Sequence, residues 1–303
     1  MLKNKTCLVT GATGFLGSHL CRKLKNLGCQ ISISNTKHAN LMNLENMEVY
    51  ESIKFDYIFH LAAVTKAGDY CLKHKGDQWI TNQIINTNIL TYWKEKQAQA
   101  KMICMGTSCS YSPNIFMSEE NYLLGQPDVD LYTYAMTKRM LLVGLTSLEE
   151  QYGLKWLYFV PSTLYGPGFE LHDNHFIFDF IRNCYNAKNK GEDFTIWGNG
   201  LQKRELIHVD DASNIMISLI DYENQIFNLG SGQDYTIREF AKKVCEIYNY
   251  DFDLVKYNLA KYIGVKEKKL VVSKITSCLG GSFLKTNLED GLRESIEYFL
   301  EER

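Results

Sequence analysis

The stretch of sequence that decides the fold is TCLVTGATGFLGSHL, residues 6–20. A short apolar run (6–10) leads into a loop that contains Gly11, Gly14 and Gly17, and an amphipathic segment follows. In a strand–loop–helix unit of this kind, the first glycine permits a tight turn, the second lets the backbone approach a pyrophosphate, and the third allows the helix to pack closely on the strand. The phosphate then lies at the helix N-terminus. The stretch therefore predicts a dinucleotide-binding unit.

Further short apolar runs follow, with amphipathic segments between them: CQISIS (29–34), DYIFHLA (56–62), KMICMG (101–106) and WLYFVPS (156–162). This alternation is typical of an α/β protein with a parallel sheet covered by helices on both faces. We predict a doubly wound Rossmann domain over residues 1–165, to which the chain returns near 207–230. Residues 166–303 are less regular, and we expect them to form a smaller α/β lobe that binds the substrate.

Composition excludes several classes of function. A net charge of −2 over 303 residues gives no broad attraction for nucleic acid or membranes, so we expect neither as a partner. The nine cysteines include no C-x-x-C pair, which indicates free thiols in a reducing compartment and no metal site. No run reaches the roughly 18 apolar residues of a membrane-spanning helix, and the N-terminal run lacks a signal-peptide cleavage site. We therefore expect a cytoplasmic protein.

A tyrosine and a lysine four residues apart open the helical pattern YAMTKRMLLVGLTSLEEQYG (134–153). On one helix face, the Lys138 ammonium can lie near the Tyr134 phenol and favour its ionised form. Such a phenol can exchange a proton with a carbonyl or carbinol oxygen while a nicotinamide exchanges hydride. This spacing alone is common, but the polar cluster MGTSCSYSP (105–113) follows a buried strand, where side chains of a parallel sheet face the ligand crevice. Together these features predict a catalytic centre.

The end of the second predicted strand indicates which nicotinamide cofactor binds. An acidic residue there would bind the ribose hydroxyls and repel a 2′-phosphate. The sequence ISISNTKHAN (31–40) has no acid and offers Lys37, although a solvated loop lysine is the commoner role. We therefore expect NADP(H), with NAD(H) as the alternative.

Six motifs occur in the order and spacing of one family and span most of the chain: TGATGFLG (10–17), HLAAV (60–64), the 105–113 cluster, YAMTK (134–138), PSTLYGPG (161–168) and RELIHVDD (204–211). The chain resembles the extended short-chain dehydrogenases/reductases that act on sugar nucleotides. Within that superfamily it most resembles the GDP-L-fucose synthase family, on the local grounds of SCSY (108–111), SEENYLLGQP (118–127) and DNHFIFDFIRN (173–183). The resemblance implies NADPH-dependent reduction of a GDP-linked 4-keto sugar with C3/C5 epimerisation, and a homodimer paired through helices near 82–98 and 134–150.

The resemblance also assigns roles to single residues. It implies that Thr107, with Ser108 beside it, supplies a catalytic hydroxyl, that Tyr134 donates the proton and that Lys138 supports it. Cys109 and His175 become the base and acid of the epimerisation, and a thiolate and an imidazole on opposite faces of a sugar would suit inversion. Expected cofactor contacts are Gly11, Thr13, Gly14, Phe15, Leu16, Gly17, Lys37, Asn40, Leu41, Leu61, Ala62, Ala63, Lys138, Pro161, Thr163 and Leu164. Expected substrate contacts are Asn174, Arg182, Trp197 and Arg204.

The sequence departs from the family pattern at Thr163, at Asn183 and in EKKLVVSK (267–274), where asparagine, arginine and an aspartate are usual. Because these positions shape the nucleotide-sugar pocket, the sugar and the base stay open. Two alternative functions stay open as well. One is an NAD-dependent sugar-nucleotide 4-epimerase or 4-dehydrogenase, and the other is a catalytically silent protein that senses NADP(H) or binds a partner.

Overall fold

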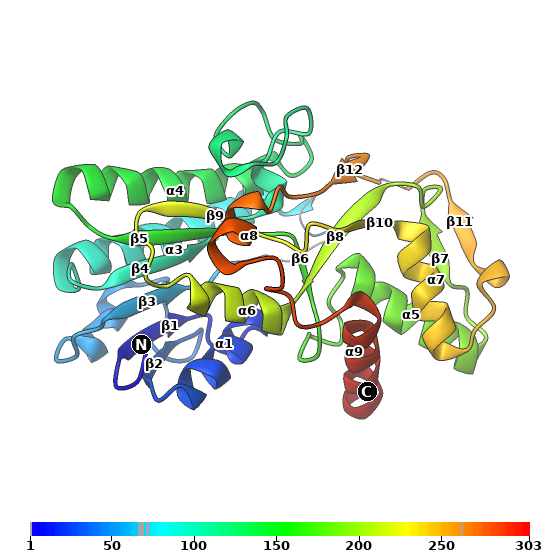
Figure 1. Cartoon of the computed structure of the whole chain (residues 1–303), viewed down its shortest axis with the longest axis horizontal. Coiled ribbons are helices and arrows are strands. Elements are labelled where there is room, and N and C mark those ends of the chain that lie inside the picture. Colours follow the sequence, from blue (N-terminus) through cyan, green and yellow to red (C-terminus); the bar gives the residue numbers. More distant parts are fainter. Residues whose placement is uncertain (1, 66–69, 71–72, 262) are drawn as a thin grey trace.

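A six-stranded parallel sheet forms the centre of the protein in the computed structural model, which describes residues 2–65, 70, 73–261 and 263–303 (Figure 1). Its order is β2-β1-β3-β4-β5-β9, and every neighbouring pair is parallel. The strands are β1 (Thr6–Thr10), β2 (Gln30–Ser34), β3 (Tyr57–His60), β4 (Lys101–Met105), β5 (Trp156–Pro161) and β9 (Gln225–Leu229). The order reverses between β1 and β3, which is where doubly wound sheets bind ligands. The predicted fold class is confirmed.

Helices cover both faces of this sheet (Figure 1). α3 (Lys75–Lys96) and α4 (Tyr132–Tyr152) cover one face, whereas α1 (Phe15–Asn26), α6 (Val209–Ser218) and α8 (Ser273–Leu279) cover the other. Alternate strand residues enter opposite cores, because successive strand side chains point to opposite faces. Leu8 packs with the α3 and α4 residues, and its neighbours Cys7 and Val9 pack under α1 and α6.

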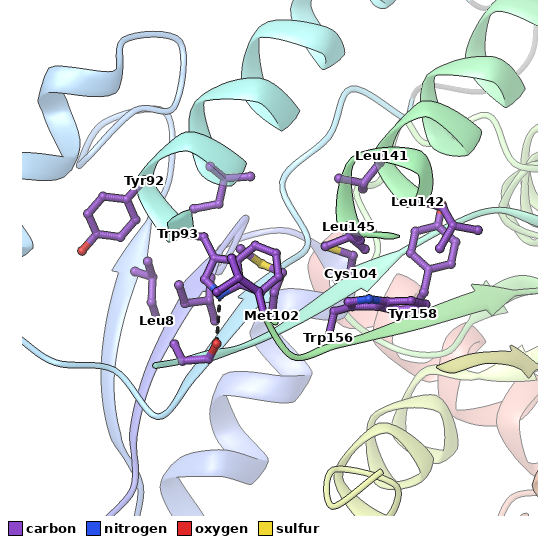
Figure 2. Close-up of a cluster of buried hydrophobic side chains, with 14 of the residues drawn as sticks. Leu8, Tyr92, Trp93, Met102, Cys104, Leu141, Leu142, Leu145, Trp156 and Tyr158 are labelled. Atoms are coloured by element: carbon purple, nitrogen blue, oxygen red, sulfur yellow. Dashed lines mark hydrogen bonds between the residues drawn. The ribbon is translucent and has the colours of Figure 1, made fainter. Parts of the chain in front are cut away.

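The core beneath α3 and α4 contains large aromatic side chains (Figure 2). Trp93 and Tyr158 are fully buried there, and Met102 of β4 packs in the same cluster. The indole Nε1 of Trp93 donates to the carbonyl oxygen of Ala100 at 2.9 Å, so its polar atom is paired despite complete burial. This packing fixes α4, and with it the Tyr134–Lys138 pair, on the sheet.

The second part of the chain has its own hydrophobic core and a smaller sheet in which β10, β8 and β12 lie in that order and β6 pairs with β8. The strands of this sheet are β6 (Thr163–Tyr165), β8 (Lys203–His208), β10 (Asp234–Thr236) and β12 (Glu267–Lys268). A separate two-stranded parallel sheet consists of β7 (Thr195–Trp197) and β11 (Lys256–Asn258). The helices are α5 (Phe176–Lys190), α7 (Ile237–Tyr248) and α9 (Leu288–Glu302). Residues 209–229 return to the first sheet, where β9 adds a strand and α6 covers one face. The chain returns a second time at α8, which packs against β9, and the sequence did not indicate this second return. A domain boundary at residue 165 stays a prediction.

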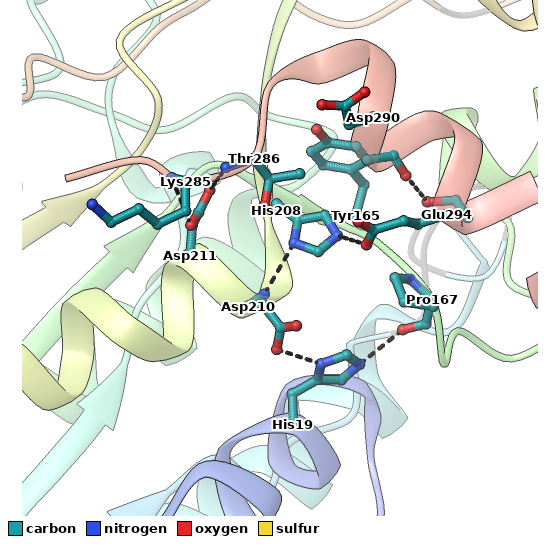
Figure 3. A network of polar contacts seen from close by, with 12 residues as sticks. His19, Tyr165, Pro167, His208, Asp210, Asp211, Lys285, Thr286, Asp290 and Glu294 are labelled. Carbon is teal, nitrogen blue, oxygen red and sulfur yellow. Dashed lines mark hydrogen bonds and ion pairs between the residues drawn. The ribbon is translucent and has the colours of Figure 1, made fainter. Parts of the chain in front are cut away.

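A buried histidine on α1 joins the two parts of the chain (Figure 3). His19 is 4% exposed; its Nδ1 lies 2.9 Å from Asp210 Oδ1 and its Nε2 lies 2.8 Å from the carbonyl oxygen of Pro167. The hydrogen bond from His19 is the main reason that the pKa of Asp210 lies well below its usual range, with Lys23 adding to the effect. His208, at the end of β8, extends the network towards Glu294 on α9, 3.3 Å away.

We predict that His19→Ala lowers the free energy of unfolding by about 1–3 kcal/mol, because it removes a buried side chain that bonds two partners. Arg22→Ala is the matched control: Arg22 also contacts Asp210, but its side chain is 60% exposed and should contribute less than about 1 kcal/mol. Urea denaturation measures both.

The stability that the His19–Asp210 contact contributes depends on pH through the Asp210 carboxyl. A carboxyl whose pKa is depressed in the fold contributes stability above its unfolded pKa of about 3.9 and loses it as the pH falls through its folded pKa. The difference between wild type and His19→Ala should therefore shrink in acid below about pH 4. Equal losses for the His19 and Arg22 variants would contradict the assignment of His19 as the link.

Candidate active site

A cavity of about 770 Å³ opens at the carboxyl ends of the parallel strands and continues between the two parts of the chain. It brings together four segments that the sequence singled out: the glycine loop, the hydroxyl cluster, the Tyr134–Lys138 pair and the start of α5. Of the predicted site residues, the lining includes Gly11, Thr13, Gly14, Phe15, Leu16, Gly17, Asn40, Leu41, Leu61, Ala62, Ala63, Thr107, Ser108, Cys109, Tyr134, Lys138, Pro161, Thr163, Leu164, Asn174, His175, Trp197 and Arg204. Lys37 and Arg182 are not part of it.

Each glycine of the first loop is required, or favoured, for a different spatial reason. Gly11 has a φ of 67°, and a Cβ there would come within 2.8 Å of the Ala62 nitrogen. A Cβ at Gly17 would lie 2.1 Å from the Gly11 carbonyl oxygen, so only glycine lets α1 pack this closely. A Cβ at Gly14 would meet only that same oxygen, at 3.3 Å, and would otherwise occupy space beside the cavity. A pyrophosphate fits a backbone left bare in this way.

The N-terminus of α1 supplies the electrostatic part of a phosphate site. Gly14 is the N-cap and provides no side-chain hydrogen bond, so the first backbone N–H groups of the helix lack a capping acceptor from it. The first turn contains no acidic residue. An anion at this end is stabilised by those N–H groups and by the helix dipole.

Sequence reasoning missed a buried polar group that holds this loop against β3. The Thr10 hydroxyl accepts hydrogen bonds from the backbone nitrogens of Leu61 (3.2 Å) and Ala62 (3.1 Å) and lies 2.9 Å from His60 Nδ1. The other ring nitrogen of His60 lies 3.0 Å from Asn86 Oδ1 on α3, and burial lowers the His60 pKa to about 4. A threonine at the end of an apolar run gave no local signal of this role.

The segment after β2 contributes no carboxylate to the cavity. Its lining residues are Ser34, Asn35, Thr36, Asn40, Leu41 and Met42. The Asn35 side chain accepts hydrogen bonds from the backbone nitrogens of Lys37 (2.8 Å) and His38 (2.9 Å), which forms a turn on the surface. This turn explains why Lys37 lies outside the lining, and a contact between Lys37 and the cofactor stays a prediction.

The Tyr134–Lys138 pair lies in the first turns of α4, and both residues line the cavity together with Met105 at the end of β4. Lys138 is 4% exposed, and its burial lowers the pKa of its ammonium to about 8, partly opposed by the Cys104 thiol. Thr107 caps a short 3-10 turn by accepting a hydrogen bond from the Cys109 nitrogen at 3.2 Å. The buried Arg139 guanidinium donates to the carbonyl oxygen of Ser110, which fixes this turn against α4.

Cys109 and His175 reach the same cavity from different elements, and each has a charged partner. The Lys268 Nζ lies 3.2 Å from Cys109 Sγ. Burial raises the pKa of the thiol, but Lys268, the Thr107 hydroxyl and Arg204 outweigh it and bring the pKa below its usual value. His175 Nδ1 lies 2.6 Å from Asp173 Oδ1, and this contact brings the Asp173 pKa below its usual range despite burial.

The two predicted substrate arginines bond to main-chain carbonyls. Arg204 lines the cavity, but its guanidinium donates to the carbonyl oxygens of Ile263 and Val265. Arg182 donates to the carbonyl oxygens of Leu171 and Asp173 and also pairs with Asp179. Arg182 therefore braces the loop that precedes His175, although its partners Asp173 and Asp179 line the cavity. A contact between Arg182 and the substrate stays a prediction.

Among the described residues no group of three or more His, Cys, Asp or Glu side chains could hold a metal ion. Within the same residues no helix is both long and apolar enough to cross a membrane.

The chain is similar to known proteins over nearly its whole length. The model of the NAD dependent epimerase/dehydratase family matches residues 7–230. A GDP-L-fucose synthase of Sinorhizobium fredii is 27% identical over 308 residues, which covers 99% of this chain and 97% of that protein.

Two solved structures share the fold. A GDP-L-fucose synthetase from Naegleria fowleri bound to NADP superposes with a TM-score of 0.87 at 23% identity, covering 99% of this chain and 95% of that one. A GDP-mannoheptose C4 reductase from Campylobacter jejuni with NADP bound gives a TM-score of 0.85 at 23% identity, covering 98% of each chain.

Proposed function

The chain belongs to the NAD dependent epimerase/dehydratase family, and from this premise we propose that it is an NADPH-dependent reductase of a GDP-linked 4-keto sugar that also epimerises C3 and C5. One observation carries the proposal. The glycine loop and the Tyr134–Lys138 pair line the same cavity as Cys109 and His175, so the groups for reduction and those for epimerisation face one ligand. The names of the relatives support a GDP-linked substrate and NADP as cofactor.

In the reduction, the glycine loop and the N-terminus of α1 would hold NADPH, which would supply a hydride to C4 of the sugar. The Tyr134 phenol donates its proton to the carbonyl oxygen, and the electron pair of the C=O double bond takes up that proton. The Lys138 ammonium favours the phenolate that forms, and a pKa of about 8 keeps this side chain largely protonated at neutral pH. The Thr107 hydroxyl polarises the same oxygen by donating a hydrogen bond.

In the epimerisation, the Cys109 thiolate removes the proton from a carbon next to the ketone, and the C–H electron pair moves into the carbonyl to give an enolate. His175 returns a proton to that carbon from the opposite face, which inverts the centre. The Asp173 carboxylate binds Nδ1 and leaves Nε2 for the sugar. Exchange with water restores the thiolate and the protonated imidazole.

Two departures from the family pattern, Thr163 and Asn183, lie in the wall of the cavity. The sugar therefore meets side chains that the usual family substrate does not meet. We propose that the sugar is either a 6-deoxyhexose or a heptose, since relatives acting on both kinds share this fold.

We propose that the enzyme is a cytoplasmic homodimer paired through α3 and α4. Large apolar side chains are exposed on both helices: Trp79 and Ile80 on α3, and Met140 and Val143 on α4. Burial of such residues against a second copy removes apolar surface from water.

We predict that Tyr134→Phe keeps NADPH binding and lowers the turnover of the 4-keto substrate by about 100-fold or more, because the ring remains while the proton donor is lost. Fluorescence titration measures binding, and loss of nicotinamide absorbance measures turnover. Turnover near that of wild type would contradict the role of Tyr134.

We predict that Cys109→Ser stops solvent deuterium from entering C3 and C5 of a 4-keto substrate incubated without NADPH, as followed by NMR. Reduction at C4 does not use the thiol, so the variant should still oxidise NADPH with a substrate whose C3 and C5 already have the product configuration. Deuterium uptake by the variant at the wild-type rate would exclude Cys109 as the base. Absence of uptake by the wild type would mean that the enzyme reduces without epimerising.

A further inference from the structure

We propose that Lys268 is a positioning residue that holds Cys109 in its thiolate form, ready to remove the sugar proton. The proposal deepens the function above and rests on Cys109 being the base of the epimerisation. The family resemblance assigns no role to Lys268, which lies in EKKLVVSK, the segment that lacks the usual aspartate.

The contact is direct and lies inside the cavity. The Nζ of Lys268 is 3.2 Å from Cys109 Sγ, and both residues line the cavity. An ammonium at this distance favours a thiolate over a thiol, because it stabilises only the charged form. The Thr107 hydroxyl contributes in the same direction.

The backbone fixes where Lys268 lies. Its strand, β12, pairs in parallel with β8, which places Lys268 opposite Arg204. Before the strand, Lys266 accepts a hydrogen bond from the Lys203 nitrogen at 2.8 Å. After it, the Leu270 nitrogen donates to the buried Glu205 carboxylate at 2.7 Å. Anchoring the backbone on both sides fixes the Cα of Lys268, so only the side chain loses further freedom when the ammonium meets the thiol.

The buried Glu205 carboxylate holds the chain that follows β12 in place. Glu205 is 2% exposed, and its carboxylate also accepts a hydrogen bond from the Gly232 nitrogen at 2.6 Å. A Cβ at Gly230 would lie 2.4 Å from Glu205 Oε1, so the chain passes directly over the carboxylate. The β12 segment is thereby tied to the loop that follows β9.

The charges around the thiol favour the thiolate. The cations that act on it are Lys268 from β12 and Arg204 from β8. The other titratable side chains in the cavity wall are Asp128, Tyr134, Lys138, Asp173, His175 and Asp179. Two of these carboxylates already have partners, since Asp173 binds His175 and Asp179 pairs with Arg182.

Neighbouring lysines and other thiols show that this pairing is specific. Lys269 points elsewhere and lies 3.6 Å from Asp234. Burial raises the pKa of the Cys21 thiol to about 11 and that of Cys104 further still, whereas the pKa of Cys109 is lowered. Lys138 also acts on the Cys104 thiol, but Cys109 has the Lys268 ammonium at 3.2 Å together with the Thr107 hydroxyl and Arg204.

The test is the rate at which iodoacetamide alkylates Cys109 between about pH 5 and pH 10, read by mass spectrometry of the peptide that contains it. A thiolate attacks the reagent, a C–S bond forms and iodide leaves. Wild-type Cys109 should titrate below the value of about 8.5 for a free thiol. Lys268→Met should raise the midpoint by about one pH unit and slow alkylation at neutral pH roughly tenfold. Lys268→Arg should restore most of the lower midpoint, and Lys269→Met, the matched control, should leave it unchanged.

Two results would overturn the proposal: a wild-type midpoint at or above that of a free thiol, or the same midpoint in Lys268→Met as in wild type. If Lys268→Met does not fold, as judged by circular dichroism, the wild-type midpoint and that of Lys268→Gln decide. The assay contains no substrate and no cofactor. Failure of the proposed function would therefore appear as absent deuterium uptake by the wild type, whereas failure of the Lys268 role would appear in the alkylation profile alone.

Discussion

The close approach of α1 to β1 is the constraint on which the rest of the structure depends. It exists because residue 17 has no side chain, so the helix backbone can rest against the carbonyl oxygen of Gly11. The same approach directs the N-terminus of α1 at the cavity and carries His19 to Pro167 and Asp210 (Figure 3). One packing contact therefore sets both the phosphate end of the cavity and the position of the second part of the chain.

The position of the second part of the chain decides which side chains line the cavity together. The first sheet contributes Thr107, Cys109 and the residues of α4, whereas α5 and β12 contribute His175 and Lys268. Neither part contains the complete set, so the proposed reduction and epimerisation both require the two to be docked. The two groups proposed for the epimerisation each have a charged partner: His175 Nδ1 lies against Asp173, and Cys109 Sγ lies against Lys268.

The sequence predicted the features that local patterns encode, and it missed the contacts between segments that are distant along the chain. Buried apolar runs identified β1, β3, β4 and β5, and the glycine loop identified the cofactor end, because both signals lie within a few residues. The approach of Lys268 to Cys109 joins positions 159 residues apart, and EKK has the composition of an exposed segment. The sequence could not show the contacts of Arg182 for a related reason. A composition pattern cannot tell whether a guanidinium will bind a ligand or the carbonyl oxygens of its own chain.

The most direct test offers the purified protein GDP-, dTDP- and UDP-linked 4-keto sugars with either NADPH or NADH, and identifies the products by NMR. An NADPH-dependent GDP-sugar reductase should consume NADPH with the GDP-linked ketone, form the C4 alcohol in equal amount, and act poorly with NADH and with the other two nucleotides. Absence of NADPH oxidation with every 4-keto sugar, or a clear preference for NADH, would contradict the central claim.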